Sequence, residues 1–123
     1  MRYLNEKDLL AIGLNWNDTI DAIEDAVVCL EKKDFAQPVK PYLRYRNPVN
    51  RIIAMPAFVG GKVNLAGIKW IASFPGNIDN GIPRAHAVVI LNKAETGEPI
   101  GIINTALLSI IRTSSVSGLM IRY

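Results

Sequence analysis

Three cationic residues stand among apolar or small residues in three separate segments: Arg44 in KPYLR, Lys69 in LAGIKWIASFPGN and Arg112 in IIRTSSVSG. Removing a charge from water is costly, so a cation in such surroundings usually has an anionic partner. No Asp or Glu lies close in sequence to Lys69 or Arg112. The pattern therefore predicts a pocket that binds carboxylates.

Lys69 and Arg112 offer different chemistry to such a ligand. A lysine within an apolar strand either reaches a sheet edge or neutralises an anion, and burial would lower its pKa toward the range useful for proton transfer. Arg112 can hold a carboxylate through two parallel hydrogen bonds, and the hydroxyls of Thr113, Ser114 and Ser115 add donors for a second anion such as a phosphate. An ion pair with an Asp or Glu from elsewhere in the domain is the alternative for Arg112.

Three further residues have plain structural explanations. Arg44 is followed by Tyr45 and Arg46, which also fits a solvated strand end. His86 is the only histidine and lacks metal-ligand spacing, so a hydrogen-bonded structural role and no metal are predicted. Cys29 lies in a helical pattern, where a small buried hydrophobe is expected rather than a nucleophile. A single cysteine excludes a disulfide within the chain and fits a cytoplasmic protein.

The composition limits the class of protein. With 123 residues, 50% of them hydrophobic, the chain is expected to form one compact domain that buries roughly two thirds of its unfolded surface. The net charge of +3 is mild and the basic residues are scattered, which argues against nucleic acid as a partner. No charged leader opens the sequence and no apolar run approaches the roughly 20 residues of a membrane span. A soluble protein with no membrane partner is expected.

Two helices are predicted at the start of the chain and one at its end. Asn5 is expected to cap a short helix that closes at Gly13, and Asn17 or Asp18 to cap a second one. The segment 105–123 has the 3.6-residue periodicity of a long helix. It reaches the last residue without a Gly or Pro stop, which predicts that the natural helix continues in a longer protein.

Short apolar runs broken by Pro and Gly predict a sheet between these helices. In the longest run, alternation places Ile68 and Trp70 on one face and Lys69 on the other, away from the aromatic core. The predicted fold is α+β, with the N-terminal helices packed on a mixed or antiparallel sheet. No dinucleotide fingerprint, nucleophile elbow, P-loop or CxxC is present. The expected strands are 39–45, 51–59, 63–74, 84–92 and 100–104.

Three segments together resemble the amino-terminal half of the ornithine cyclodeaminase and mu-crystallin family: AGIKWIASFPGN, GIPRAHAVVILNKAETGEPIGI and ALLSIIRTSSVS. The resemblance covers nearly the whole chain, with the elements in the right order. The stretches QPVKPYLR, RIIAMP and NGIPRA most resemble one branch of the family. That branch uses NAD to cleave an amino-carboxyethyl glutamate adduct oxidatively, giving 2-oxoglutarate and 2,3-diaminopropionate for siderophore assembly.

The resemblance implies roles for individual residues. Arg44, Lys69 and Arg112 would hold substrate carboxylates, and Lys69 would also polarise or relay a proton at the reacting carbon. Arg112 and Thr113 would lie beside the pyrophosphate of the cofactor. The resemblance further implies that residues 1–123 are a substrate-binding and dimerisation domain, followed in the full-length protein by a Rossmann domain that this chain lacks. This chain alone is then expected to bind no NAD and to be inactive.

Three functions remain compatible with these residues. The first is the substrate-binding and dimerisation domain of an NAD-dependent opine-type dehydrogenase, acting as a homodimer. The second is a domain of an ornithine cyclodeaminase, a lyase that converts ornithine into proline. Asn104 stands where relatives often have Glu, which leaves the substrate open. The third is a non-catalytic binding protein like mu-crystallin, against which the presence of Lys69 and Arg112 argues.

Overall fold

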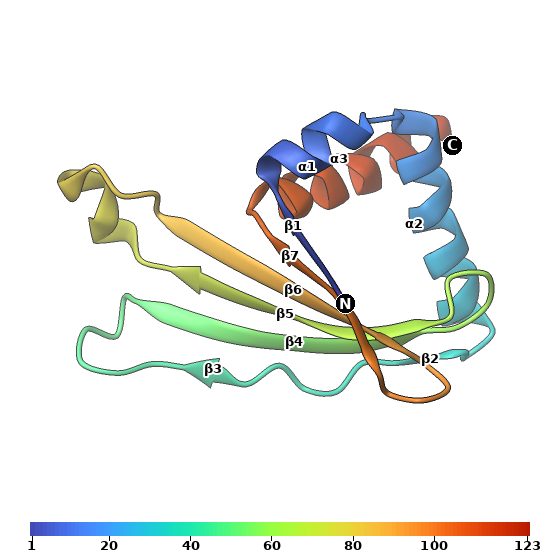
Figure 1. The fold of residues 1–123 in the computed structure, drawn as a ribbon, viewed down its shortest axis with the longest axis horizontal. Helices are drawn as coiled ribbons and strands as arrows, with labels where there is room; N and C mark the ends of the chain where they lie inside the picture. Colours follow the sequence, from blue (N-terminus) through green and yellow to red (C-terminus); the bar gives the residue numbers. More distant parts are fainter.

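The computed structural model describes residues 1–123 and shows one mixed sheet with all three α-helices on one side of it (Figure 1). The strand order is β1-β7-β6-β5-β4-β2, with β3 pairing with β4 as well. The β1–β7 pair is parallel and every other pair is antiparallel. The α+β prediction is confirmed. The strands are β1 (Arg2–Asn5), β2 (Phe35–Ala36), β3 (Tyr42–Leu43), β4 (Arg51–Val59), β5 (Leu65–Ser73), β6 (Ala85–Lys93) and β7 (Pro99–Asn104).

The helices begin where polar side chains can bind free backbone amides. Asn5 caps α1 (Glu6–Ile12) in a capping box with Asp8. The predicted start of the second helix was wrong. The helix α2 (Trp16–Glu31) begins earlier, because the Asn15 side chain accepts a hydrogen bond from the backbone N of Asp18, so Asn17 and Asp18 lie inside the first turn. The third helix, α3 (Leu107–Arg122), starts two residues after Thr105.

Three short elements differ from the sequence prediction. The expected strand 39–45 contracts to the two residues of β3, because Pro41 has no N–H to donate, although its carbonyl still accepts from the N of Ala54 at 3.2 Å. The strands β1 and β2 are too short to show alternation and were not predicted. The expected loop 75–83 contains a 3₁₀ helix, η1 (Pro75–Asn80).

The register of the sheet assigns each side chain to a face. Met55, Lys69, Val89 and Ile103 are direct neighbours across β4, β5, β6 and β7, so they share one face. This face looks toward the helices, since Lys69 contacts α3. Trp70 lies on the opposite face, which no helix covers, and is 43% exposed. The alternation was predicted correctly, but the aromatic side is not the core. An apolar alternation predicts which side chains share a face of the sheet, but it does not indicate whether the same chain covers that face.

Helices α2 and α3 pack closely against one another at one end of the molecule. A Cβ atom on Gly118 would lie 2.7 Å from the Cδ1 atom of Ile20, so any side chain at position 118 would require Ile20 to shift. The end of α3 is held by Arg122, whose NH1 atom lies 2.7 Å from Asp21 Oδ1 and 3.3 Å from Glu24 Oε2. Cys29 is buried at the other end of α2, as expected for a small hydrophobe.

The chain exposes more surface than a compact domain of its size. Its accessible area is 8529 Å² and only six of 123 residues are buried, whereas a compact monomer of 13.5 kDa is expected to expose about 6,500 Å². The predicted burial of two thirds of the unfolded surface is therefore not reached within this chain. None of the helices has both the length and the apolar character needed to cross a membrane.

Candidate functional site

Lys69 occupies the middle of β5 and points at the helical layer. Its side chain is part-buried, and its Nζ atom donates a hydrogen bond to the Oγ atom of Ser109 at 3.2 Å. Ser109 lies in the first turn of α3. The link places the ammonium group of Lys69 in the gap between the centre of the sheet and the start of this helix.

The surroundings of Lys69 lower its pKa from the ordinary value of 10.5. Burial is the largest cause, because it penalises the charged form. The positive charges of Arg112 and then Lys40 add to the effect. No acidic residue raises this pKa, and neither Lys69, Arg112 nor Lys40 forms an ion pair within the chain.

A hollow of about 180 Å³ opens beside this group. Its walls contain no acidic residue. The ion pairs of the structure use Lys62, Lys93 and Arg122 and none of the cations around the hollow, so the alternative of an internal ion pair for Arg112 is wrong. Nor does any group of three His, Cys, Asp or Glu side chains gather anywhere in the chain. The hollow is lined by Lys69, Val89, Leu108, Ser109 and Arg112.

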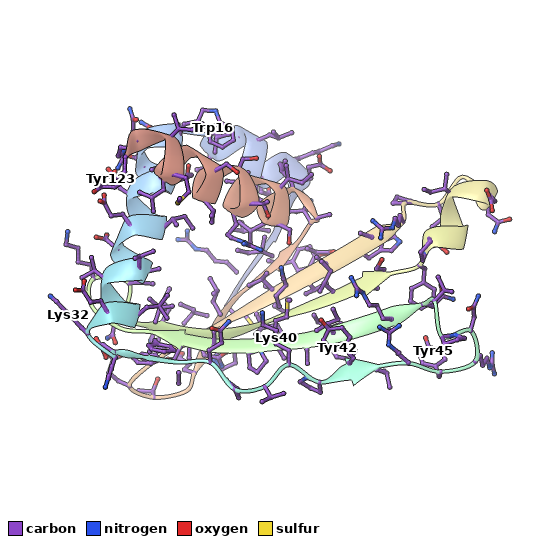
Figure 2. The ribbon with its side chains drawn as sticks, turned by 180° about the vertical axis from the view of Figure 1, so that it is seen from behind. Trp16, Lys32, Lys40, Tyr42, Tyr45 and Tyr123 are labelled. Carbon is purple, nitrogen blue, oxygen red and sulfur yellow. The ribbon has the colours of Figure 1, made fainter.

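Sequence reasoning missed Lys40 as a member of this cluster. In the β3–β4 pairing Tyr42 lies opposite Ile53, and the hydrogen bond from Ala54 to Pro41 continues that pairing toward the start of the chain. Lys40 therefore lies beside Met55, which is the direct neighbour of Lys69. Figure 2 shows Lys40 along the segment that precedes β3, next to Tyr42. Alternation through VKPYLRY, extended from the helix-facing Tyr42, would have given this placement.

Arg44 is not brought to the hollow. Its NH1 atom donates to the carbonyl oxygen of Pro48 at 2.5 Å, and its guanidinium lies 5.7 Å from the centre of the Tyr42 ring. Arg44 lies on the same face of the sheet as Lys40, because the two are an even number of residues apart. It is four residues further along the chain, which is about 13 Å in an extended segment. In Figure 2 the neighbouring Tyr45 lies on the side of the molecule opposite Tyr123, well beyond the beginning of α3. A substrate-binding role for Arg44 stays a prediction, in a different part of the sheet face.

The hydroxyl groups that follow Arg112 are not equivalent. Thr113 is exposed and donates from Oγ1 to the carbonyl of Ser109 at 2.9 Å. Ser115 is 1% exposed and donates to the carbonyl of Ile111 at 2.8 Å. The predicted use of Ser115 as a donor to a bound anion is therefore wrong, because its hydroxyl is enclosed and already bonded. Thr113 and Ser114 remain accessible.

The two other singled-out polar residues lie on the open face of the sheet. His86 is exposed and makes no side-chain hydrogen bond, so the expected hydrogen-bonded structural role is not found. Asn104 is in register with Val88 and Trp70, and its Nδ2 atom donates to the hydroxyl of Tyr3 at 2.7 Å. Because Asn104 points away from Lys69, its difference from the frequent Glu does not alter the hollow directly.

Comparison with known proteins identifies relatives for nearly the whole chain. The family model described as the ornithine cyclodeaminase/mu-crystallin family matches residues 6–123. The chain is 42% identical, over 95% of its length, to an N-((2S)-2-amino-2-carboxyethyl)-L-glutamate dehydrogenase of Staphylococcus aureus, and 33% identical, over 89%, to an alanine dehydrogenase of Archaeoglobus fulgidus.

A solved structure of an archaeal alanine dehydrogenase, described as a dimer with bound NAD, superposes with a TM-score of 0.84 at 29% identity. The superposition covers 94% of this chain and 34% of that one. The matched region likewise makes up 37% of the Staphylococcus aureus dehydrogenase and 33% of the Archaeoglobus fulgidus protein. The chain thus spans little more than a third of the length of its relatives.

Proposed function

The chain belongs to the ornithine cyclodeaminase/mu-crystallin family, and we propose that it is the substrate-binding and dimerisation domain of an NAD-dependent opine-type amino-acid dehydrogenase. The proposed substrate is the glutamate adduct named for the Staphylococcus aureus relative. Its oxidation transfers a hydride from the glutamate α-carbon to NAD⁺ and releases a proton. Water then hydrolyses the resulting imine to 2-oxoglutarate and 2,3-diaminopropionate, a building block for siderophores.

One observation carries this proposal: Lys69 and Arg112 line a hollow that contains no acid of this chain, and the charge of Lys40 is close enough to help lower the pKa of Lys69. The guanidinium of Arg112 and the ammonium of Lys69 in this hollow, with the ammonium of Lys40 nearby, are matched by carboxylates, through charge-assisted hydrogen bonds. A substrate with several carboxylates satisfies them. Ornithine, the substrate of the alternative lyase, carries a terminal ammonium group for which these residues offer repulsion and no partner.

Lys69 is the residue we assign to catalysis. Its lowered pKa eases the release of a proton from its ammonium group, and its position allows contact with the reacting centre of a ligand held by Arg112. The hydrogen bond to Ser109 orients the group toward α3. Lys69 would polarise the substrate or relay a proton, while the hydride acceptor is supplied by the cofactor.

NAD would be held mainly by a Rossmann domain that follows residues 1–123 in the full-length protein. Within this chain, Arg112 offers a positive charge and the exposed Thr113 a hydroxyl on the same turn of α3, a pair of groups that fits a pyrophosphate. We assign these two residues to the edge of the cofactor site. Because the larger part of the binding site lies outside this chain, we expect no stable NAD complex of residues 1–123 alone.

The open sheet face is the proposed dimer surface. The face around Trp70 is apolar, and the chain exposes about 2,000 Å² more than a compact monomer of its mass. An excess of this size is comparable to the area that stable protein interfaces bury. The archaeal relative described as a dimer supports the same assembly. We place the protein in the cytoplasm, where a reduced Cys29 and an NAD pool are both expected.

Turnover by the full-length protein tests the function. We expect NADH to accumulate, with equimolar 2-oxoglutarate, when N-((2S)-2-amino-2-carboxyethyl)-L-glutamate and NAD⁺ are supplied. L-ornithine should give neither NADH nor ammonia. Release of ammonia and proline from ornithine, with no oxidation of the adduct, would assign the chain to a cyclodeaminase instead.

A further inference from the structure

A second group of cations lies on the same face of the sheet as Lys69, away from the hollow. The guanidinium groups of Arg44 and Arg51 each lie 5.7 Å from the centre of the Tyr42 ring. Their charges are therefore no further apart than twice that distance. Both arginines use the tyrosine as a shared support, which limits the orientations that their side chains can adopt.

The strand register explains why the two arginines meet. Tyr42 is opposite Ile53 and Leu43 opposite Ile52, so the same pairing continued by one residue places Arg44 opposite Arg51. Like charges that face each other directly across antiparallel strands destabilise a sheet. No Asp or Glu forms an ion pair with either arginine. An anion from outside the chain would relieve this repulsion.

The neighbours of Arg51 suit such an anion. Arg51 is half-buried at the first residue of β4, and Ser73 is its direct partner on β5, so a hydroxyl lies on the same face beside it. Arg44 is fixed from behind by its hydrogen bond to the Pro48 carbonyl. Two guanidinium groups and a hydroxyl make a set of donors typical of a carboxylate site.

A carboxylate-binding role for Arg44 is already what the family resemblance implies. We propose that Arg51, held beside Arg44 on Tyr42, completes a second anion-binding subsite that takes a distal carboxylate of the ligand bound at Lys69. The two subsites share one face and lie about 13 Å apart along the strands at the level of the backbone. Because the side chains at both subsites are long, the distance between their charged groups can be shorter than this backbone separation. A ligand of several carbon atoms can then span the two subsites. The subsite would thus select polycarboxylates over monocarboxylates. Only the chemical identity of its ligand rests on the proposed function.

Binding of straight-chain acids to the full-length protein tests the subsite. Succinate, glutarate and adipate are compared with butyrate, valerate and hexanoate, in the unsubstituted protein and in Arg51→Gln, by isothermal titration. We expect the unsubstituted protein to prefer at least one dicarboxylate to the monocarboxylate of equal length. Arg51→Gln should weaken that dicarboxylate about tenfold, the scale of one charge-assisted hydrogen bond, and leave the monocarboxylate unchanged.

The matched control is Arg46→Gln, which removes the same charge from the adjacent loop at a residue that contacts neither Tyr42 nor an acid. It should change neither affinity. Equal losses for both acids in Arg51→Gln, no loss for either, or no dicarboxylate preference in the unsubstituted protein would each overturn the subsite.

The same variant separates the subsite from the proposed function. If the dicarboxylate preference depends on Arg51 but the glutamate adduct is not oxidised, the subsite stands and the proposed function fails. If the adduct is oxidised at equal rates by the unsubstituted protein and by Arg51→Gln, the proposed function stands and the subsite fails.

Discussion

Lys69 reaches from the centre of the sheet to Ser109 on α3, and the partner of its ammonium group is a hydroxyl 3.2 Å away, not a carboxylate. A neutral hydroxyl can hold the group in place without neutralising its charge. The positive charge therefore remains available to a ligand.

Carboxylate binding should be linked to protonation of Lys69. Burial, Arg112 and Lys40 lower the pKa of Lys69 in the free protein, and a bound anion favours the charged form and raises that pKa. Binding should thus be accompanied by proton uptake between the lowered pKa and 10.5, and affinity should fall as the pH rises through this window. Isothermal titration in buffers of different ionisation enthalpy measures the uptake. Lys69→Met should abolish it, and proton uptake that persists in this variant would assign the effect to another group.

The lowered pKa of Lys69 should also make the free energy of unfolding depend on pH. Because its pKa is lower in the folded than in the unfolded chain, the unfolded state binds more protons across the window below 10.5. The free energy of unfolding should then rise with pH in that window. Urea titrations at several pH values measure this slope, with Lys69→Met as the reference. An identical slope in both proteins would contradict the assignment.

Lys40 should contribute to carboxylate binding although it lies in an irregular segment. We expect Lys40→Gln to weaken the glutamate adduct about tenfold, which corresponds to about 1.4 kcal/mol. The same change should raise the pKa of Lys69, because one of the charges that lowers it is gone. Lys32, an exposed lysine at the end of α2, gives the matched control, and Lys32→Gln should alter neither quantity. Equal affinities for the Lys40→Gln and unsubstituted proteins would remove Lys40 from the site.

The Trp70 face should decide the oligomeric state. Trp70→Glu places a carboxylate at the centre of an apolar surface, where burial without a partner is costly. We expect the full-length protein to sediment as a dimer and this variant as a monomer. Ile12→Glu changes an apolar residue of α1 that is 71% exposed on the other side of the molecule, and it should leave the dimer intact. A dimer that survives Trp70→Glu with unchanged affinity would place the interface elsewhere.

The contact between Gly118 and Ile20 should limit what α3 tolerates. A branched side chain at position 118 would collide with Ile20, so Gly118→Val is expected to lower the free energy of unfolding by about 1–3 kcal/mol. Adding Ile20→Ala should recover part of that loss, and chemical denaturation of the four proteins of this cycle measures the coupling. Gly76→Val serves for comparison, because a side chain there meets no atom within 4 Å. Additive effects at 118 and 20 would show that the two residues do not interact.

Local patterns in the sequence predicted the three α-helices, the four long strands and the sheet face of Lys69, but neither the short strands nor the start of α2. Strand alternation around Lys69 and Trp70 separated the two faces correctly, because a strand of nine residues shows its period clearly. Lys40 was not predicted as a site residue because it lies outside the two-residue strand β3, although the alternation of VKPYLRY puts it on the same side as Tyr42. The grouping of the cations depends on register between strands distant in sequence, which no local pattern encodes.

The choice of core face failed for a different reason. The residues around Trp70 have the composition of an interior, yet nothing within this chain covers them. Periodicity indicates only that one face of a strand is apolar. It holds no information on whether the cover belongs to the same chain, to another domain or to another copy.

Only six residues are buried inside one copy, so in the proposed dimer a large part of the apolar surface would become buried only on association. Folding and dimerisation would then be one coupled equilibrium that depends on protein concentration. The thermal midpoint of unfolding should then rise with protein concentration. Before it dimerises, a newly synthesised chain would expose its apolar sheet face and be prone to aggregation.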